Sequence, residues 1–372
     1  SQGHGAGRVA VKLGVGAALV DGTLVPGDVE ITDGKIAAVG VSSANGMGLA
    51  APGFVDLQVN GFAGVDFFSA DAAGYRKAGA ALLECGVTAY QPTFITSPEA
   101  ELTAALHEVP HNGSAPRIIG AHLEGPFLSP ERLGTHPPES RRDPDCGLLE
   151  RLLAAGPVSH VTLAPELAGA NDLMDLLQQR GVTVSCGHSN ATAAEAREAF
   201  ARGAKTVTHI FNAMRPFAAR EPGLAGAALV AADVAIQVIL DGVHLADDTA
   251  RLVWLAAPGR VAIVTDAIAA AGAGDGSYSL AGVDFEVENG VARNAERVLA
   301  GSTVCMIDAV RNLVALGAPV EAALSAATAV PAKIAGRTDL GTLEPGSPAD
   351  VVVLDDNLEI TRVLVGGDDK TG

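Results

Sequence analysis

The segment APGFVDLQVNGF, residues 51–62, contains an apolar stretch that passes into alternating polar residues. Strands that are buried on both faces, as in parallel sheets, are apolar along most of their length. Residues 54–59 are therefore predicted to form a buried parallel strand. Gln58 and Asn60 stand two positions apart, so their side chains are expected on the same face of this strand.

Similar apolar segments recur along the chain, separated by Ala/Leu/Glu-rich stretches of helical character such as 171–180 and 193–202. Eight strand–helix units within about 250 residues have the size of a (β/α)8 TIM barrel. A doubly wound open α/β sheet is the alternative, because a strand count does not establish closure. The seven further predicted strands are 87–94, 118–123, 158–164, 183–187, 206–210, 236–240 and 261–265.

The two ends of the chain have a different, β-rich texture. Asp-Gly pairs at 21–22 and 33–34 lie between alternating apolar stretches, which is a strong hairpin pattern. Residues 340–367 offer two or three strands and no helix. We expect both termini to build one small β-sandwich domain beside the barrel. The predicted division is 8–50 and 339–372 for the β domain, and 51–338 for the catalytic barrel.

Charge and cysteine content limit the partners and the compartment. The 372 residues carry a formal net charge of −18, which argues against nucleic acid or an anionic membrane surface as a partner. No apolar run reaches the roughly 18 residues of a membrane helix. Cys85, Cys146, Cys186 and Cys305 are scattered without a C-x-x-C pair, so we expect separate core thiols in a reducing, cytoplasmic setting.

Several predicted strands end in a histidine or a carboxylate, and the C-terminal ends of barrel strands form the catalytic face. A single histidine there is more often a hydrogen-bonded loop residue, and a single Asp can cap the next helix. Their recurrence at one end of several strands favours a shared site. The residues are Glu124 after the third strand, His188 after the fifth, His209 after the sixth, His244 after the seventh and Asp266 after the eighth.

Glu124, His188 and His209 offer one carboxylate oxygen and two imidazole nitrogens. This set suits one divalent metal per chain, first of all Zn²⁺ and otherwise Fe²⁺, Co²⁺ or Mn²⁺, with a position open for water. A metal can lower the pKa of bound water from about 15.7 towards 7. An ionised Asp266 beside that water could then take its proton near neutral pH.

Seven motifs in order carry a resemblance that covers nearly the whole chain, and the ordered set is far more specific than any one of them. They are PGFVDLQVNG, HLEGPF, GHSNA, THIFNAM, REPGLAGA, DGVH and VTDA. Together they resemble the N-acetylglucosamine-6-phosphate deacetylase family of the amidohydrolase superfamily. The resemblance implies hydrolysis of the acetamide of N-acetyl-D-glucosamine 6-phosphate to D-glucosamine 6-phosphate and acetate, in amino-sugar catabolism or cell-wall recycling.

The resemblance also implies residue roles. Glu124, His188 and His209 match the metal ligands, and Asp266 matches the general base that later acts as an acid. A homodimer is implied, because the family's arginine can reach the site of a neighbouring subunit. The implied contacts to the substrate are His136, which also assists catalysis, Asn212, Ala213, Arg220 as that arginine, and His244.

Gln58 and Asn60 stand where related barrels carry His-x-His. Amides bind divalent metals poorly compared with imidazole, so the pattern predicts a one-metal enzyme in which these amides hydrogen-bond Glu124 or a water. The Pro-rich, charged stretch 129–145 is interpreted as a mobile lid over the substrate. The alternatives are a deacetylase of N-acetylgalactosamine 6-phosphate, another amidohydrolase such as one acting on a cyclic amide, and a non-catalytic sugar-phosphate-binding barrel. The last would have no use for Asp266 as a proton carrier.

Overall fold

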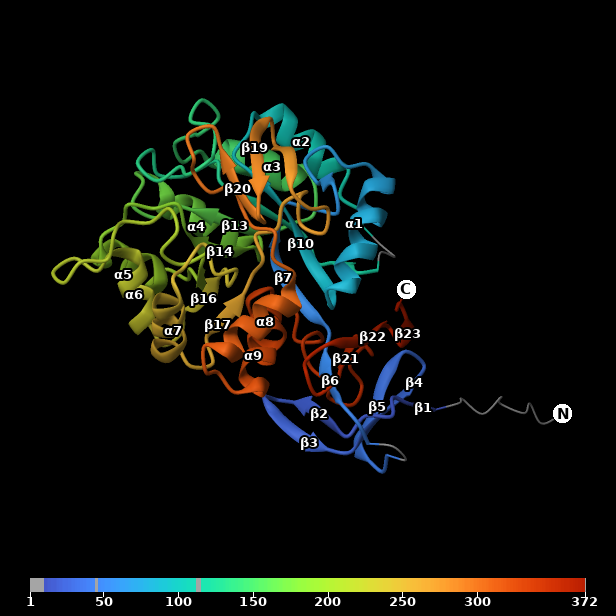
Figure 1. Ribbon diagram of the computed structural model, residues 1–372. Coiled ribbons are helices and arrows are strands. Elements are labelled where there is room, and N and C mark those ends of the chain that lie inside the picture. Colours follow the sequence, from blue (N-terminus) through green and yellow to red (C-terminus); the bar gives the residue numbers. More distant parts are fainter. Residues whose placement is uncertain (1–9, 44–45, 112–114, 372) are drawn as a thin grey trace.

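The computed structural model describes residues 10–371 other than 44–45 and 112–114 (Figure 1). Eight parallel strands run in sequence order around a barrel, with β7 paired to β10 and then β12 to β17 side by side. A short strand, β11 (Arg117–Ile118), also pairs with β10. The barrel strands are β7 (Phe54–Val59), β10 (Val87–Ile95), β12 (Ala121–Glu124), β13 (Val158–Leu163), β14 (Thr183–Cys186), β15 (Thr206–Val207), β16 (Ala235–Val238) and β17 (Val261–Ile263).

The first strand meets the chain that follows the last strand. Val59 and Ala267 form a parallel bridge, and the backbone N–H of Asn60 donates to the carbonyl of Ala267 over 2.7 Å. The Thr265 hydroxyl adds a bond to the Asp56 carboxylate at 2.6 Å. These contacts close the sheet on itself. The predicted (β/α)8 barrel is therefore confirmed, and the open-sheet alternative is wrong.

Helices follow most barrel strands and cover the outside of the barrel (Figure 1). The helices expected at 171–180 and 193–202 are α4 (Ala170–Gln179) and α5 (Ala193–Ala201). Helix α5 begins at a capping box in which the side chains of Thr192 and Glu195 bind each other's backbone N–H. The other helices are α1 (Ala72–Glu84), α2 (Glu99–His107), α3 (Cys146–Ala155), α6 (Gly223–Val230), α7 (Asp247–Ala256), α8 (Met306–Ala315), α9 (Val320–Ala327) and α10 (Ala329–Ile334).

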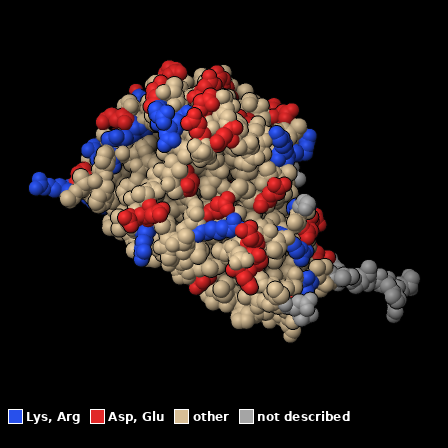
Figure 2. Space-filling view, viewed as in Figure 1, with Lys and Arg blue, Asp and Glu red and all other residues tan. Residues whose placement is uncertain are grey.

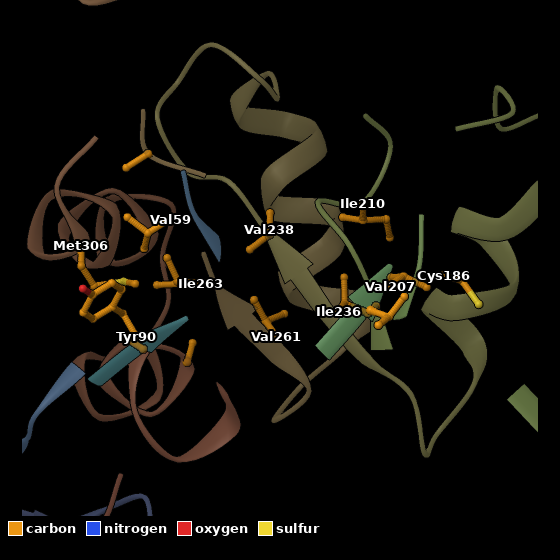
Figure 3. Close-up of a cluster of buried hydrophobic side chains, with 14 of the residues drawn as sticks. Val59, Tyr90, Cys186, Val207, Ile210, Ile236, Val238, Val261, Ile263 and Met306 are labelled. Atoms are coloured by element: carbon orange, nitrogen blue, oxygen red, sulfur yellow. The ribbon is translucent and has the colours of Figure 1, made fainter. Parts of the chain in front are cut away.

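The main core lies between the strands and this helical layer. Figure 3 shows part of it, where Ile236, Val238, Val261 and Ile263 of neighbouring strands are buried beside one another. Burying a side chain of this kind contributes about 1.5–3 kcal/mol each. The rigid barrel that results fixes the positions of the strand ends.

Both chain termini contribute to one small β domain, as predicted. A six-stranded sheet has the order β23-β22-β21-β6-β2-β3, and a three-stranded sheet has the order β1-β4-β5. Both Asp-Gly pairs form the expected hairpin turns, with positive φ at Asp21 and Asp33. Positions 8–9, 44–45 and 372 of the predicted domain lie outside the described residues. The strands are β1 (Val11–Lys12), β2 (Ala17–Val20), β3 (Thr23–Pro26), β4 (Asp28–Thr32), β5 (Lys35–Val41), β6 (Leu49–Pro52), β21 (Val351–Leu354), β22 (Ile360–Val365) and β23 (Asp368–Asp369).

A three-stranded antiparallel insertion follows β17 and was not predicted. It consists of β18 (Gly276–Leu280), β19 (Val283–Glu288) and β20 (Val291–Asn294). Its apolar side chains, among them Phe285, pack against Ile95 and Ile268 near the C-terminal end of the barrel. The alternating sequence VDFEVE followed by Asn-Gly was the available signal for this hairpin. A further short pair, β8 (Gly61–Phe62) and β9 (Val65–Asp66), follows the first barrel strand.

The cysteines differ from expectation. Cys85, after α1, and Cys305, before α8, form a disulfide with a Cα–Cα distance of 5.5 Å, whereas Cys146 and Cys186 are free. The prediction of four separate thiols is wrong for this pair, because the fold brings together two residues 220 positions apart in the sequence. Among the residues that the structure describes, no helix is both long and apolar enough to span a bilayer.

Candidate active site

Glu124, His188 and His209 converge at the C-terminal ends of β12, β14 and β15. Nε2 of His209 lies 2.8 Å from Oε1 of Glu124, and Nε2 of His188 lies 3.1 Å from the same oxygen. All three side chains are buried, and one ligand atom from each lies within 4.8 Å of the others. Both histidines have positive φ, 46° for His188 and 28° for His209, a strained backbone of the kind that is concentrated at functional sites.

The hydrogen bonds of His188 indicate that this cluster fits a cation. Its Nδ1 lies 2.9 Å from the carbonyl oxygen of Arg132, and a carbonyl can only accept, so Nδ1 carries the proton. In the neutral ring Nε2 then presents a lone pair to the Glu124 carboxylate. A lone pair and a carboxylate that face each other repel, unless a cation lies between them. A histidine tautomer fixed in this way is typical of metal ligands.

His136 is placed beside the cluster by Thr96. Nδ1 of His136 accepts from the Thr96 backbone N–H at 3.3 Å and lies 2.9 Å from the Thr96 hydroxyl. Because the backbone N–H can only donate, the proton of a neutral His136 is on Nε2. That nitrogen lies 3.6 Å from Oε2 of Glu124, and His136 is one of the residues that line the cavity. His136 can therefore donate a hydrogen bond to a group bound in the cavity.

Asp266 is held by Asn60. Nδ2 of Asn60 donates to Oδ1 of Asp266 over 2.7 Å, and both side chains are almost fully buried. Burial and the nearby Glu124 carboxylate raise the pKa of Asp266 to about 6, while the bond from Asn60 opposes this rise. Gln58 and Asn60 were expected to hydrogen-bond Glu124 or a water, and the part of this expectation that names Glu124 is wrong. Asn60 binds Asp266 instead, and the buried Gln58 amide has no hydrogen-bond partner among the described residues.

One cavity of about 370 Å³ connects these groups. Of the predicted sugar-phosphate contacts, Asn212, Ala213 and His244 line it together with the cluster, His136 and Asp266. His244 is oriented by Asp241, whose Oδ2 lies 2.7 Å from its Nδ1. Arg220 is exposed and does not line the cavity of its own chain. The structure thus brings together all the predicted site residues except Arg220.

The predicted lid contributes Glu131, Arg132, Gly134, Thr135 and His136 to the cavity wall. It is tied to the body by the backbone N–H of Ser129, which donates to the carbonyl of His188, and by contacts of its charged side chains with Asn190. In the described structure the loop therefore packs over the cavity.

Sequence reasoning missed several residues of the site. Thr96 orients His136 and stands in no distinguishing motif. Asp241 orients His244 and is the first residue of the DGVH motif, but no role was predicted for it. Leu280, from the unpredicted insertion, and Val298 and Leu299, from the segment that follows it, form an apolar wall. The Asn-Gly hairpin signal could have located that insertion, but not the face that it presents to the site.

The barrel strands are also less apolar than expected where they face the barrel interior. His122 and His160 stack there with ring centroids 4.2 Å apart, and Nε2 of His122 lies 2.7 Å from the Thr162 hydroxyl. Burial lowers the pKa of His122 to about 4, so this ring is neutral at pH 7. The expectation of strands that are apolar throughout fails at these positions. Hydrogen bonds between inward side chains, such as that between Nδ1 of His160 and the Gln91 side chain, pair many of their polar atoms, whereas Nε2 of His160 has no partner among the described residues.

The comparisons agree with this geometry. The family model described as "Amidohydrolase family" matches residues 49–369. N-acetylglucosamine-6-phosphate deacetylase of Homo sapiens is 38% identical over 329 residues, which cover 83% of this chain and 80% of that protein. N-acetylgalactosamine-6-phosphate deacetylase of Escherichia coli O157:H7 is 37% identical over 290 residues, which cover 76% of this chain and 77% of that protein.

Solved structures give the same relationship. A D267A mutant of N-acetyl-D-glucosamine-6-phosphate deacetylase from Mycobacterium smegmatis, in complex with N-acetyl-D-glucosamine-6-phosphate, superposes with a TM-score of 0.92 at 35% identity. The match covers 98% of this chain and 100% of that one. The deacetylase of Thermotoga maritima gives a TM-score of 0.90 at 30% identity, covering 97% and 99% of the two chains. By its sequence, its closed barrel and its Glu/His/His cluster, the chain belongs to the amidohydrolase family.

Proposed function

We propose that this chain hydrolyses the acetamide of N-acetyl-D-glucosamine 6-phosphate, releasing D-glucosamine 6-phosphate and acetate. The observation that carries the proposal is one cavity in which a buried Glu/His/His cluster, Asp266 and a proton-donating His136 face the same space. The deacetylases among the relatives support the choice of an N-acetylated sugar phosphate as substrate. A chain that only bound such sugars would need neither the cluster nor Asp266.

Glu124, His188 and His209 would hold one divalent metal, with Zn²⁺ the first candidate and Fe²⁺, Co²⁺ or Mn²⁺ the others. When bound, the metal supplies a water of lowered pKa and an electrophile for the amide oxygen. With Gln58 and Asn60 on the first strand in place of two imidazoles, we propose a single metal per chain.

The chain's own groups then handle protons and charge. Ionised Asp266 removes a proton from the attacking water, and the Nε2–H of His136 stabilises negative charge that develops on the amide oxygen. Protonated Asp266 next gives its proton to the departing nitrogen. This second transfer is required because an unprotonated amine is a very poor leaving group.

Asn212, Ala213 and His244 are proposed to hold the sugar phosphate, since all three line the cavity. Burial alone would raise the pKa of Asp241, but the hydrogen bonds from His244 hold it below its usual value. An ionised Asp241 keeps Nδ1 of His244 protonated and its ring in place. Arg220 is proposed to reach the site of a neighbouring copy in a homodimer, because it is exposed and lies outside its own cavity.

Acetate release from N-acetylglucosamine 6-phosphate tests the proposal directly. Activity should disappear on treatment with a chelator and return on addition of Zn²⁺, because the cluster alone cannot activate water at neutral pH.

N-acetylgalactosamine 6-phosphate is the second candidate substrate, since the Escherichia coli relative is named for it. Measuring kcat/KM for both epimers decides between them, with the glucosamine form expected to be higher. Tight binding of either sugar phosphate without release of acetate would contradict both deacetylase activities and would support a sugar-phosphate-binding protein.

Replacing Asn60 by Leu should raise the pH at which activity is lost on acidification. Its hydrogen bond favours ionised Asp266, so loss of the bond raises the pKa of Asp266 and leaves the base protonated over a wider pH range. A hydrogen bond to a charged group is worth about 1.5–3 kcal/mol, or about one to two pH units. Activity at pH 6 should therefore fall more than activity at pH 8.

The pH dependence of kcat/KM measures this shift. The wild-type acid limb should lie at or below pH 6, because a bound cation lowers the pKa of Asp266 further from its value of about 6. Gln58→Leu is the matched control, since this buried amide lies two residues before Asn60, in β7, and makes no side-chain hydrogen bond to a described residue. An identical acid limb in Asn60→Leu and wild type would contradict the role of Asn60.

A further inference from the structure

Arg132 differs from every other lysine and arginine of the described chain in that it lines the active-site cavity. The chain carries a net charge of −18, and three carboxylates, Glu124, Glu131 and Asp266, line the same cavity. Figure 2 shows acidic groups spread widely over the face in view, with basic groups among them. A dianionic phosphate that enters this field needs a local cation to offset it.

The Arg132 guanidinium is held in place without being neutralised. Its Nε and Nη2 donate to Oδ1 of Asn190 over 3.1 and 2.9 Å, whereas Nη1 has no hydrogen-bond acceptor among the described residues. None of the described carboxylates forms an ion pair with Arg132. The positive charge of Arg132 and the N–H groups of its Nη1 therefore remain available to a ligand.

Asn190 is a rigid support for this side chain. Its backbone N–H donates to Glu166 at 2.6 Å, its carbonyl accepts from Arg215 at 2.7 Å, and its Nδ2 donates to Glu131 at 2.8 Å. Asn190 thus also donates a hydrogen bond to the carboxylate of Glu131, the residue that precedes Arg132 in the sequence. A guanidinium whose rotamer is already fixed loses less entropy when it binds an anion.

The backbone of Arg132 contacts the proposed metal site, whereas its side chain faces the cavity. The Arg132 carbonyl accepts from Nδ1 of His188 and so fixes the tautomer of a proposed metal ligand. A side-chain substitution leaves this carbonyl in place, so the metal site provides an internal control. Any effect that operates through a displaced loop would change metal content, whereas an effect on anion binding would not.

We propose that Arg132 is a specificity-determining residue whose guanidinium binds the phosphate of the substrate; the assignment rests on the function proposed above. Arginine suits this task because its planar donors match phosphate oxygens and its charge persists at any working pH. The proposal gives each chain an arginine of its own for the phosphate, in addition to Asn212, Ala213 and His244 and to the Arg220 assigned to a neighbouring copy.

The test compares Arg132→Met, which keeps an unbranched apolar stem but removes the guanidinium, with Arg132→Lys, which keeps the charge. For N-acetylglucosamine 6-phosphate, Arg132→Met should raise KM about 10- to 100-fold, the loss expected for one hydrogen bond to a charged group. Its kcat, its metal content and its KM for unphosphorylated N-acetylglucosamine should match those of the wild type. Arg132→Lys should recover most of the loss. Arg142→Met is the control, because Arg142 lies in the same loop but binds only backbone carbonyls and does not line the cavity.

The outcomes separate the possible failures. An equal rise in KM for both sugars, or a loss of metal in Arg132→Met, would overturn the proposal and leave Arg132 a structural role in the loop. An unchanged KM for the phosphorylated sugar would overturn it as well. If the wild type releases no acetate, the proposed function fails, and calorimetric titration with inorganic phosphate still decides whether Arg132 binds the anion. In that titration the wild type should bind phosphate more tightly than Arg132→Met.

Discussion

Asp266→Asn should lower kcat by about 10²–10⁴-fold while leaving metal content unchanged. The substitution keeps the shape of the side chain, and an amide oxygen can still accept the bond from Asn60. It removes the one group that can first take a proton from water and then return it to the leaving nitrogen. Both chemical steps therefore slow down, whereas the binding of substrate and metal should persist.

Steady-state kinetics and elemental analysis of the same preparation check this expectation. Since Asp266 is not among the three clustered ligands, the metal content of the variant should equal that of the wild type. Activity close to wild type in Asp266→Asn would remove Asp266 from the mechanism. Loss of metal together with activity would instead make Asp266 a ligand and the proposed proton carrier would have to be another group.

His209→Ala should lose both the metal and the activity. Nε2 of His209 makes the shortest contact with Glu124, at 2.8 Å, so its removal takes one of three ligands from the cluster. Loss of a group that only supports a ligand already lowers metal affinity about 10–100-fold, and loss of a ligand should cost more. His188→Ala should behave in the same way.

Elemental analysis after dialysis, with circular dichroism to verify folding, measures this loss. His107→Ala is the matched control, because His107 is an exposed histidine at the end of α2. Full metal content in a folded His209→Ala protein would contradict the assigned ligand set. Two metals per chain in the wild type would contradict the proposal that Gln58 and Asn60 exclude a second one.

The local chemistry of the sequence was enough to predict most of the fold. The apolar segments, the helical stretches between them and the Asp-Gly turns depend on neighbours along the chain, so their patterns can be read directly. Glu124, His188, His209 and Asp266 were identifiable because parallel barrel strands all end on one face, which turns positions in sequence into proximity in space. For the same reason the sequence was enough to predict that these four residues share one site.

Other features arise from contacts between distant residues, and only the tertiary structure decided them. Barrel closure through Val59 and Ala267, the disulfide of Cys85 with Cys305, and the bond from Asn60 to Asp266 join segments about 200 positions apart. No local pattern encodes the partner of such a contact, because packing of the whole barrel sets it. The sequence by itself therefore determined which groups reach the catalytic face. The fold decided which of them touch, which ring nitrogen of His136 and of His188 carries the proton, and which cation, Arg132, lines the cavity.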